Sequence, residues 1–270
     1  MQREKNSHSL SREDAYRVEL LLPPVAEQRR IAAILDQAEA LRAQRRNALQ
    51  LIHALRESLF LDQFGNPFTN PLKWPMATVG EIADVQGGLQ VTSTRKALPV
   101  EVPYLRVANV YRGRLALLEI KTIRATAAEV ARTQLLQDDL LVVEGHGNPE
   151  EIGRTAVWTG EIESCVHQNH LIRVRVDQER ALAMYCAEYL NSRGGRQYLL
   201  RSGKSTSGLN TINVSNVRAT PIALPPLERQ KVFADSLRSV KAIELSHASA
   251  LVELDVLVTS LQHRVFSGQL

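Results

Sequence analysis

Apolar residues recur at alternating steps of three and four in two long segments of the chain, and this spacing predicts two long helices. The pattern is typical of a coiled-coil seam. The seam positions are Ile31, Ile34, Leu41, Ile52, Leu55 and Leu59 in the first segment, and Phe233, Val240, Ile243, Leu254, Leu257 and Leu261 in the second. A single helix of this kind cannot bury its apolar stripe alone. If the region between them is compact, its ends lie close together, so we expect the helices to form an antiparallel coiled coil.

The two helical segments are copies of one sequence. Residues 22–66 align without a gap on residues 224–268, each residue 202 positions before its mate, and thirteen positions are identical. Both copies begin with Leu-Pro-Pro, and proline suits the first turn of a helix because its missing N–H costs nothing there. The first copy ends at Gly65-Asn66-Pro67, which cannot continue a helix. A repeat that brackets a unique middle is typical of a spacer holding one reading module, and helices inside a globular core are the alternative.

One polar position interrupts both seams. Arg45 and His247 are mates in the repeat and lie in the middle of the two stripes. They form either a polar layer that sets the register of the helices or a pair of side chains that reach out to solvent. Both interpretations remain open at the level of sequence.

The region between the repeats predicts one mixed α/β domain. Candidate strands lie at 78–85, 104–110, 140–144, 155–158 and 171–176, and 181–191 predicts a helix closed by Gly194-Gly195. The expected fold class is therefore α+β, with this domain flanked by the two long helices. The expected segments are an N-terminal tail (1–21), a first helical region (22–66), the mixed domain (67–221) and a second helical region (222–270).

Composition and charge refine this picture only slightly. Hydrophobic residues make up 44% of the 270 residues, which is typical of a globular protein. Two cysteines are too few for a disulfide framework, and the first residues lack the apolar stretch of a leader, so we expect a cytoplasmic protein. A net charge of +4 weakly favours polyanionic partners.

Three short motifs suggest catalysis or metal binding, but each lacks a required part. Gly203-Lys204-Ser205-Thr206 resembles the end of a phosphate-binding loop, yet Tyr198 stands where that motif needs glycine. His167 and His170 lack a nearby third metal ligand, and two hydrogen-bonding side chains are the more common role of such a pair. Glu144 with His146 has no accompanying nucleophile. We therefore expect no catalytic residue and no metal site on this chain.

Basic, amide and hydroxyl side chains gather in loops of the mixed domain. Cations position a protein on phosphates, whereas amides, hydroxyls and arginine read base edges. The candidate DNA-binding residues are Gln90, Thr92, Thr94, Arg95, Lys96, Arg112, Arg114, Lys204, Ser205 and Asn210. Each residue taken singly is more often part of a solvated loop, but the clusters together favour contact with a nucleic acid.

Several motifs, in their order, resemble the specificity (S) subunit of type I restriction-modification systems. Leu22-Pro23-Pro24-Val25 followed by Glu27-Gln28-Arg29 is similar to the start of that family's helical regions. The middle resembles one of its target recognition domains. The matching motifs there are Trp74, Val79-Gly80-Glu81-Ile82, Pro103 through Val110, Asp139-Leu140-Leu141-Val142, Gly153-Arg154 and Asn210 through Val217.

The resemblance implies a subunit that reads double-stranded DNA and does not itself catalyse a reaction. Its helices would act as a spacer and as a docking scaffold for modification (methyltransferase) and restriction (translocase/nuclease) subunits. Adenine methyl transfer from S-adenosylmethionine, and ATP- and magnesium-dependent translocation and cleavage, would belong to those partners. No membrane association is implied.

One departure from the family pattern concerns the number of recognition domains. The usual member has two, whereas this sequence has one between two helices, and residues 10–21 match the exit of a recognition domain at 212–223. The chain therefore resembles a half-length form, and a homodimer or a second half subunit could complete it and read an inverted repeat. The alternatives are a helical adaptor that does not bind DNA and a stand-alone metal-dependent nuclease.

Overall fold

The computed structural model describes residues 23–206 and 209–266, and the side chains of residues 204–210 and 266 are not described. The expected N-terminal tail, residues 1–21, lies outside the described residues. Contacts divide the chain into two compact units, one made of residues 54–240 and the other of residues 1–53 with residues 241–270. We call them the central unit and the helical unit. The boundary between them falls inside both long helices.

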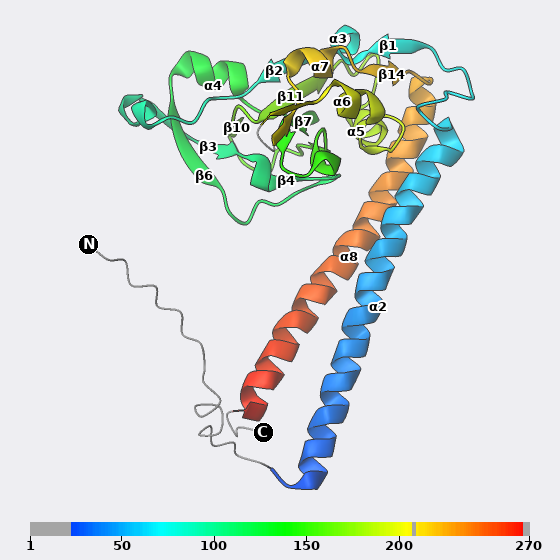
Figure 1. The fold of residues 1–270 in the computed structure, drawn as a ribbon, viewed down its shortest axis with the longest axis vertical. Helices are drawn as coiled ribbons and strands as arrows, with labels where there is room; N and C mark the ends of the chain where they lie inside the picture. Colours follow the sequence, from blue (N-terminus) through cyan, green and yellow to red (C-terminus); the bar gives the residue numbers. More distant parts are fainter. Residues whose placement is uncertain (1–22, 207–208, 267–270) are drawn as a thin grey trace. The chain divides into compact units, whose positions relative to one another are not determined.

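The two long helices run antiparallel, as the heptad pattern predicts (Figure 1). They are α2 (Val25–Phe64) and α8 (Leu227–Phe266). Within the helical unit, Arg42 pairs with Asp255 at 2.5 Å, Arg45 lies 3.1 Å from His247, and His53 lies 3.8 Å from Glu244. The residue number rises along α2 as that of its partner falls along α8, which establishes the antiparallel direction and confirms the predicted fold class.

Both helices begin with the same side-chain cap, which explains why the two repeat copies share a glutamine near the start of the helix. The Gln28 Nε2 atom donates to the Pro23 carbonyl oxygen at 2.8 Å, and the Gln230 Nε2 atom donates to the Pro225 carbonyl oxygen, also at 2.8 Å. Glutamine at this position thus satisfies a carbonyl just before the helix. At its other end α2 stops at Gly65, whose φ of +74° is the left-handed cap that glycine provides.

The inward-facing stripe of each helix departs from the predicted seam positions. Among the predicted positions Ile52, Phe233 and Val240 are buried, and Ile31, Leu59, Leu254 and Leu261 are half-buried. Ile34, Leu41, Leu55, Ile243 and Leu257 are exposed. In each case the next residue along the helix faces inward instead. Leu35 is less exposed than Ile34, Arg42 than Leu41, and Arg56 than Leu55. Val258 is likewise buried while Leu257 is exposed. A straight helix drifts about 20° per heptad from a strict seven-residue repeat, so its inward stripe moves to the next residue.

The central unit is built on two main sheets, which confirms the mixed domain. A four-stranded antiparallel sheet has the order β2 (Ala83–Gly87), β11 (Leu171–Val176), β7 (Asp139–Val143) and β9 (Thr155–Val157). A three-stranded mixed sheet has the order β10 (Val166–His167), β3 (Val100–Leu105) and β6 (Lys121–Ala125). Strand β7 is buried along its whole length, so the first sheet forms the centre of the unit.

Shorter elements complete the central unit. The helices are α3 (Val79–Ile82), α4 (Ala127–Thr133), α5 (Ala183–Asn191), α6 (Gln197–Ser202) and α7 (Val214–Arg218), and the 3-10 turns are η1 (Ser93–Ala97), η2 (Val107–Asn109) and η3 (Pro149–Glu151). The short strand groups are β1 (Met76–Thr78) with β14 (Pro221–Ala223), β4 (Val110–Tyr111) with β5 (Arg114–Leu115), and β8 (Gly145–His146) with β13 (Leu209–Thr211) and β12 (Lys204–Thr206).

An aromatic cluster joins the ends of both long helices to the core of the central unit. Phe60 and Phe64 come from α2, Tyr185 and Tyr189 from α5, and Phe233 from α8. Their rings lie in contact, with centroids 4.9 Å apart for Phe64 and Tyr185 and 5.1 Å apart for Phe64 and Phe233. Tilted and edge-on contacts of this kind add to the burial of large apolar side chains. These helix ends are therefore part of the folded core of the unit.

Two predicted strands are wrong in part. The segment 78–85 is interrupted by the helical turn α3, and 104–110 is interrupted by the turn η2. The Glu81 carboxylate accepts from the Thr78 N–H at 2.6 Å and from the Thr78 hydroxyl at 2.8 Å, so a helix-starting cap overrides the β-branched sequence.

No described helix combines the length and apolar character needed to cross a bilayer.

Candidate nucleic-acid interface

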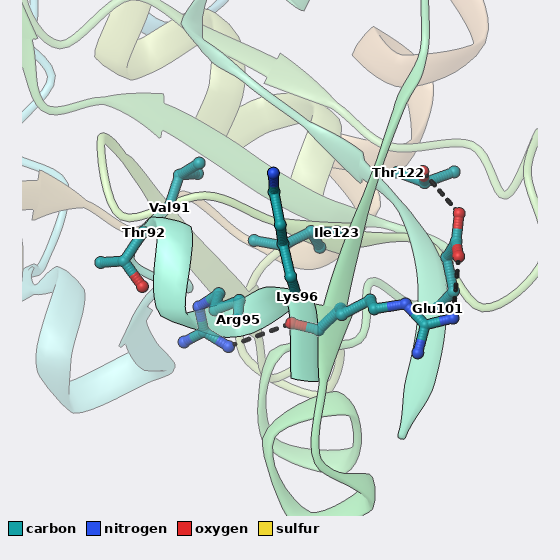
Figure 2. Close-up of a pocket in the computed structure, with 8 residues that line it drawn as sticks. Val91, Thr92, Arg95, Lys96, Glu101, Thr122 and Ile123 are labelled. Carbon is teal, nitrogen blue, oxygen red and sulfur yellow. Dashed lines mark hydrogen bonds and ion pairs between the residues drawn. The ribbon is translucent and has the colours of Figure 1, made fainter. Parts of the chain in front are cut away.

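Four of the predicted DNA-binding residues lie on or beside the turn η1. Thr92 and Thr94 are exposed and bond to each other at 2.8 Å between their hydroxyl oxygens. Lys96 is exposed and makes no ion pair within the described part of the chain. Thr92 and Lys96 line a shallow hollow of about 280 Å³, and Figure 2 shows both side chains. The hollow is open and holds a free cation beside hydroxyls, which suits a phosphate.

Arg95 in the same turn has a different environment. Its guanidinium makes a bidentate pair with Glu129 of α4, at 3.1 and 2.9 Å, and its side chain is only 14% exposed. The Arg95 bonds, with help from the Thr126 N–H, lower the pKa of Glu129 to about 2. Arg95 therefore fastens η1 to α4, and the structure does not leave its charge free for a phosphate.

The ion pair on the other wall of the hollow is weaker. Arg124 lies 3.4 Å from Glu101, which also accepts a hydrogen bond from the Thr122 hydroxyl at 2.9 Å (Figure 2). Both charged side chains are more than one-third exposed, so solvent screens the pair. Lys96 consequently supplies most of the uncompensated positive charge of the hollow.

The two predicted arginines of the β4–β5 hairpin also differ from each other. Arg112 donates to the carbonyl oxygens of Glu150 and Asn191, at 2.8 and 3.4 Å, so it holds the turn η3 in place. Burial, and the nearby guanidinium of Arg196, lower the pKa of Arg112. Arg114 is exposed and its guanidinium lies 4.2 Å from the centre of the Tyr111 ring. Of the two, Arg114 is the one accessible to DNA.

Of the remaining predicted residues, three belong to β12 and β13, while Gln90 precedes η1 and its carbonyl oxygen accepts from the Arg95 guanidinium. Lys204, Ser205 and Asn210 belong to β12 and β13 by their backbone, while their side chains are outside the described residues. Strand β13 pairs with β8, with Asn210 opposite His146. Gln90 is exposed and follows Leu89, whose carbonyl oxygen accepts from the Asn169 N–H at 2.8 Å. The sequence thus located three separate surfaces of the central unit.

The histidines that could suggest metal binding do not form a metal site. His167 is fully buried, with Nδ1 3.0 Å from the Thr133 carbonyl oxygen and Nε2 3.3 Å from that of Gln86. Burial lowers the pKa of His167 to about 4, so the ring is neutral and structural. The His146 Nδ1 atom accepts from the Asn148 N–H at 3.0 Å. Among the described residues no three His, Cys, Asp or Glu side chains are grouped to bind a metal ion.

The structure reveals a polar group that the motif analysis assigned to no function. Glu144, His146, Gln168, Asn169 and His170 lie on neighbouring turns, and each is half-buried or exposed. The His170 Nδ1 atom lies 3.5 Å from the Glu144 carboxylate. The sequence signal was present, since these residues form the two histidine motifs, but their spacing along the chain did not show that they meet.

Comparison with known proteins identifies a consistent set of relatives. A sequence profile described as the type I restriction modification DNA specificity domain matches residues 71–254. The specificity subunit of the type I restriction enzyme StySPI from Salmonella potsdam is 26% identical over 94% of the chain, and that of EcoKI from Escherichia coli is 25% identical over 94%. The chain spans 58% of the length of each of these relatives.

Solved structures share the fold. A chain from a study of assembly and conformational transition of the type I R-M system superposes with a TM-score of 0.60 at 21% identity, covering 97% of this chain and 64% of that one. The HsdS subunit from Thermoanaerobacter tengcongensis superposes with a TM-score of 0.52 at 20% identity, covering 100% of this chain and 65% of that one.

Proposed function

The chain belongs to the family of type I restriction modification DNA specificity domains, and on that premise we propose that it reads one half-site of a bipartite DNA target. Residues 67–221 would form the recognition domain, and the paired helices would set the spacing between half-sites. The chain would not catalyse a reaction. S-adenosylmethionine, ATP and magnesium would act on modification and restriction subunits bound to it in the cytoplasm.

The family match over residues 71–254 carries this proposal, because it spans most of the central unit. The geometry supports it. Lys96 is exposed in the turn η1 and Arg114 is exposed at the start of β5, and a folded scaffold that presents cations at its surface suits a nucleic-acid reader. The shallow hollow beside Lys96 is open enough for a phosphate of the backbone.

The outer face of α8 supports a docking role for the helices. Leu245, Val252 and Val256 lie 61%, 62% and 66% exposed in the described structure. They are spaced by seven and four residues and so follow one stripe of the helix. Exposed aliphatic stripes mark protein interaction surfaces, and we assign this stripe to a modification subunit.

The repeat supports a second recognition domain at the other end of the helices. In the central unit the Gln230 Oε1 atom accepts from the Leu182 N–H at 2.8 Å, in addition to the cap. Its mate Gln28 is exposed and makes only the cap bond among the described residues. A small apolar hollow lies near Gln28, and it is lined by Ile31, Leu35, Leu261 and Val265 along with Glu27, Arg30 and Ile34. A second copy or a second half subunit would supply the domain that covers it.

Methylation mapping tests the function directly. The chain is expressed with its modification subunits in cells that lack other adenine methyltransferases, and methylated adenines are located by sequencing. We expect a gapped site, and an inverted repeat if two copies of this chain assemble. Absence of any methylated motif, with the complex intact, would contradict the proposal.

Two further measurements separate the alternatives. A helical adaptor would bind the modification subunits and leave their affinity for random duplex DNA unchanged. A stand-alone nuclease would cleave DNA when the purified chain is given magnesium or zinc, which the proposal does not expect.

A further inference from the structure

Three turns of the central unit meet around one short segment, Gln168 to His170. The Asn169 N–H donates to the Leu89 carbonyl oxygen at 2.8 Å, which ties the segment to the turn before Gln90. The Glu144 N–H donates to the His170 carbonyl oxygen at 3.0 Å, which ties it to the turn that follows β7. The Ile212 N–H then donates to the Glu144 carbonyl oxygen at 2.8 Å. The backbone of Glu144 is therefore fixed on both sides.

The Glu144 side chain is unusual among the buried or partly buried acids of this unit. Asp139 pairs with Arg175 at 2.7 Å, Glu151 with Arg154 at 2.8 Å and Glu129 with Arg95 at 2.9 Å. Glu144, whose side chain is 24% exposed, has instead His170 at 3.5 Å, and that imidazole is 53% exposed. Burial raises the pKa of Glu144, against the opposing effect of His170.

A partly buried carboxylate without a guanidinium partner is costly to maintain. The fold does not need the Glu144 side chain, since the bonds that hold this turn come from its backbone N–H and carbonyl groups. The remaining acceptor capacity of the carboxylate is thus suited to a donor from outside the chain.

The neighbouring side chains indicate what kind of donor this is. The segments 86–90, 144–149 and 167–170 contain amides, imidazoles and this one carboxylate, and they contain no lysine or arginine. Gln90 and Asn148 are exposed, and Gln168 and Asn169 are half-buried. Such a surface is poorly suited to phosphates, which cations bind, and well suited to the polar edges of bases.

We propose that Glu144 reads an exocyclic amino group of a base in the major groove, and that His170 is a positioning residue for its carboxylate. The proposal rests on the proposed function and adds a residue that discriminates between bases. A carboxylate accepts from the N4 amino group of cytosine, and the N6 amino group of adenine offers the same chemistry. His170, 3.5 Å from the carboxylate, limits the rotation of the Glu144 side chain.

The first experiment selects bound sites from a randomised duplex library, using the chain with its modification subunits. We expect Glu144→Leu, which removes the acceptor at similar size, to lose about tenfold in discrimination at one base pair of the site and to keep it elsewhere. The dependence of affinity on salt should not change, since no phosphate contact is lost. His170→Asn should weaken discrimination at the same base pair, with the same thermal stability as the parent. Glu179→Leu, at an exposed carboxylate on the loop before α5, is the matched control and should behave as the parent.

The second experiment removes the amino group from the DNA. At the base pair found above, cytosine or adenine is replaced by the analogue that lacks its amino group. The parent chain should bind this duplex about tenfold more weakly, while Glu144→Leu should bind both duplexes equally. Which of the two analogues has the effect identifies the base.

The outcomes separate this inference from the proposed function. A parent complex that selects no site would overturn both. If Glu144→Leu selects the parent's site with equal discrimination, the inference alone is overturned. An equal loss of affinity for every base at every position, or an analogue effect that persists in Glu144→Leu, would also overturn it.

Discussion

The guanidinium of Arg45 lies 3.1 Å from the Nδ1 atom of His247, and the two residues are 202 positions apart, which is the offset of the sequence repeat. Two residues at the same position of the two repeat copies can touch only on the two-fold axis that relates the copies. The helix pair is therefore pseudo-symmetric about the Arg45–His247 contact. Each feature at one end of the pair has a sequence mate at the other, which is why the Gln28 cap repeats the Gln230 cap.

Replacing this polar contact by leucines should stabilise the helix pair. Arg45→Leu with His247→Leu fills the middle layer with apolar side chains, and a polar layer in a coiled coil costs stability while it fixes register. We expect the free energy of unfolding to rise by about 1 kcal/mol in urea titrations followed by circular dichroism. If the polar layer also sets the register of the helices, the double variant should sediment as more than one oligomeric state. A double variant less stable than the parent would contradict the prediction.

The aromatic cluster should dominate the stability of the central unit. Phe64 is 3% exposed and contacts Phe60, Tyr185 and Phe233. Phe64→Ala should lower the free energy of unfolding by about 3–5 kcal/mol, because it leaves a cavity among rings. Phe68, 53% exposed near Arg201, is the control, and its alanine variant should change stability by less than about 1 kcal/mol. Similar losses for both would show that the cluster is not the core.

Alanine should destabilise the central unit at one glycine of the polar turns, Gly88, and should be tolerated at another, Gly147. A Cβ at Gly88 would lie 2.3 Å from the backbone oxygens of His167 and Gln168, whereas a Cβ at Gly147 would meet nothing within 4 Å. Gly88→Ala should therefore destabilise the unit by about 1–3 kcal/mol and disturb the turn that carries Asn169. Gly147→Ala should be neutral to within about 0.5 kcal/mol. Thermal unfolding of the two variants provides the comparison, and a tolerated Gly88→Ala would contradict the close approach.

His167 should make stability depend on pH below neutrality. Its pKa falls from 6.5 to about 4 in the folded protein because burial disfavours the charged ring. Above pH 6.5 the ring is neutral in both states and the stabilisation is fully present. As the pH falls from 6.5 toward 4, the unfolded chain binds a proton that the folded chain does not, and about 3 kcal/mol is lost.

Urea titrations between pH 7 and pH 4 test this dependence. His167→Asn should flatten the loss across that window relative to the parent, although it lowers stability at neutral pH. His263→Gln, which changes an exposed histidine of α8, should keep the slope of the parent. Equal slopes in all three proteins would show that His167 does not titrate as its burial requires.

Lys96 and Arg95 are adjacent, but Lys96 should affect DNA binding whereas Arg95 should affect stability. Lys96→Ala should weaken DNA binding and reduce the slope of log affinity against log salt by about one unit, as for a single phosphate contact. Arg95→Ala should instead lower stability by about 1–2 kcal/mol, and Glu129→Gln should lower it similarly, because both break the bidentate pair. A salt slope that changes with Arg95 and not with Lys96 would reverse the assignment.

The heptad pattern located both long helices, which begin three and five residues inside the regions predicted at 22–66 and 222–270, since periodicity and the Pro-Pro and Gly-Asn-Pro signals are local properties of the chain. The buried strands β7, β9 and β11 were also predictable, because their apolar runs are continuous or alternate. The stripe that faces inward was not. It depends on how a helix with 3.6 residues per turn meets its partner, and this moved the contact from Leu257 to Val258.

The sequence by itself determined the antiparallel helix pair, the α+β class, and the family through the order of short motifs. Tertiary structure decided which charges are free and which polar groups meet. Arg95 and Lys96 are neighbours in sequence, but only Arg95 finds a carboxylate, 34 residues away on α4. Glu144 and His170 are brought together because β7 and β11 pair in the sheet and their ends coincide. A local pattern records what a segment can form, whereas ion pairs and binding surfaces depend on contacts between segments far apart in the chain.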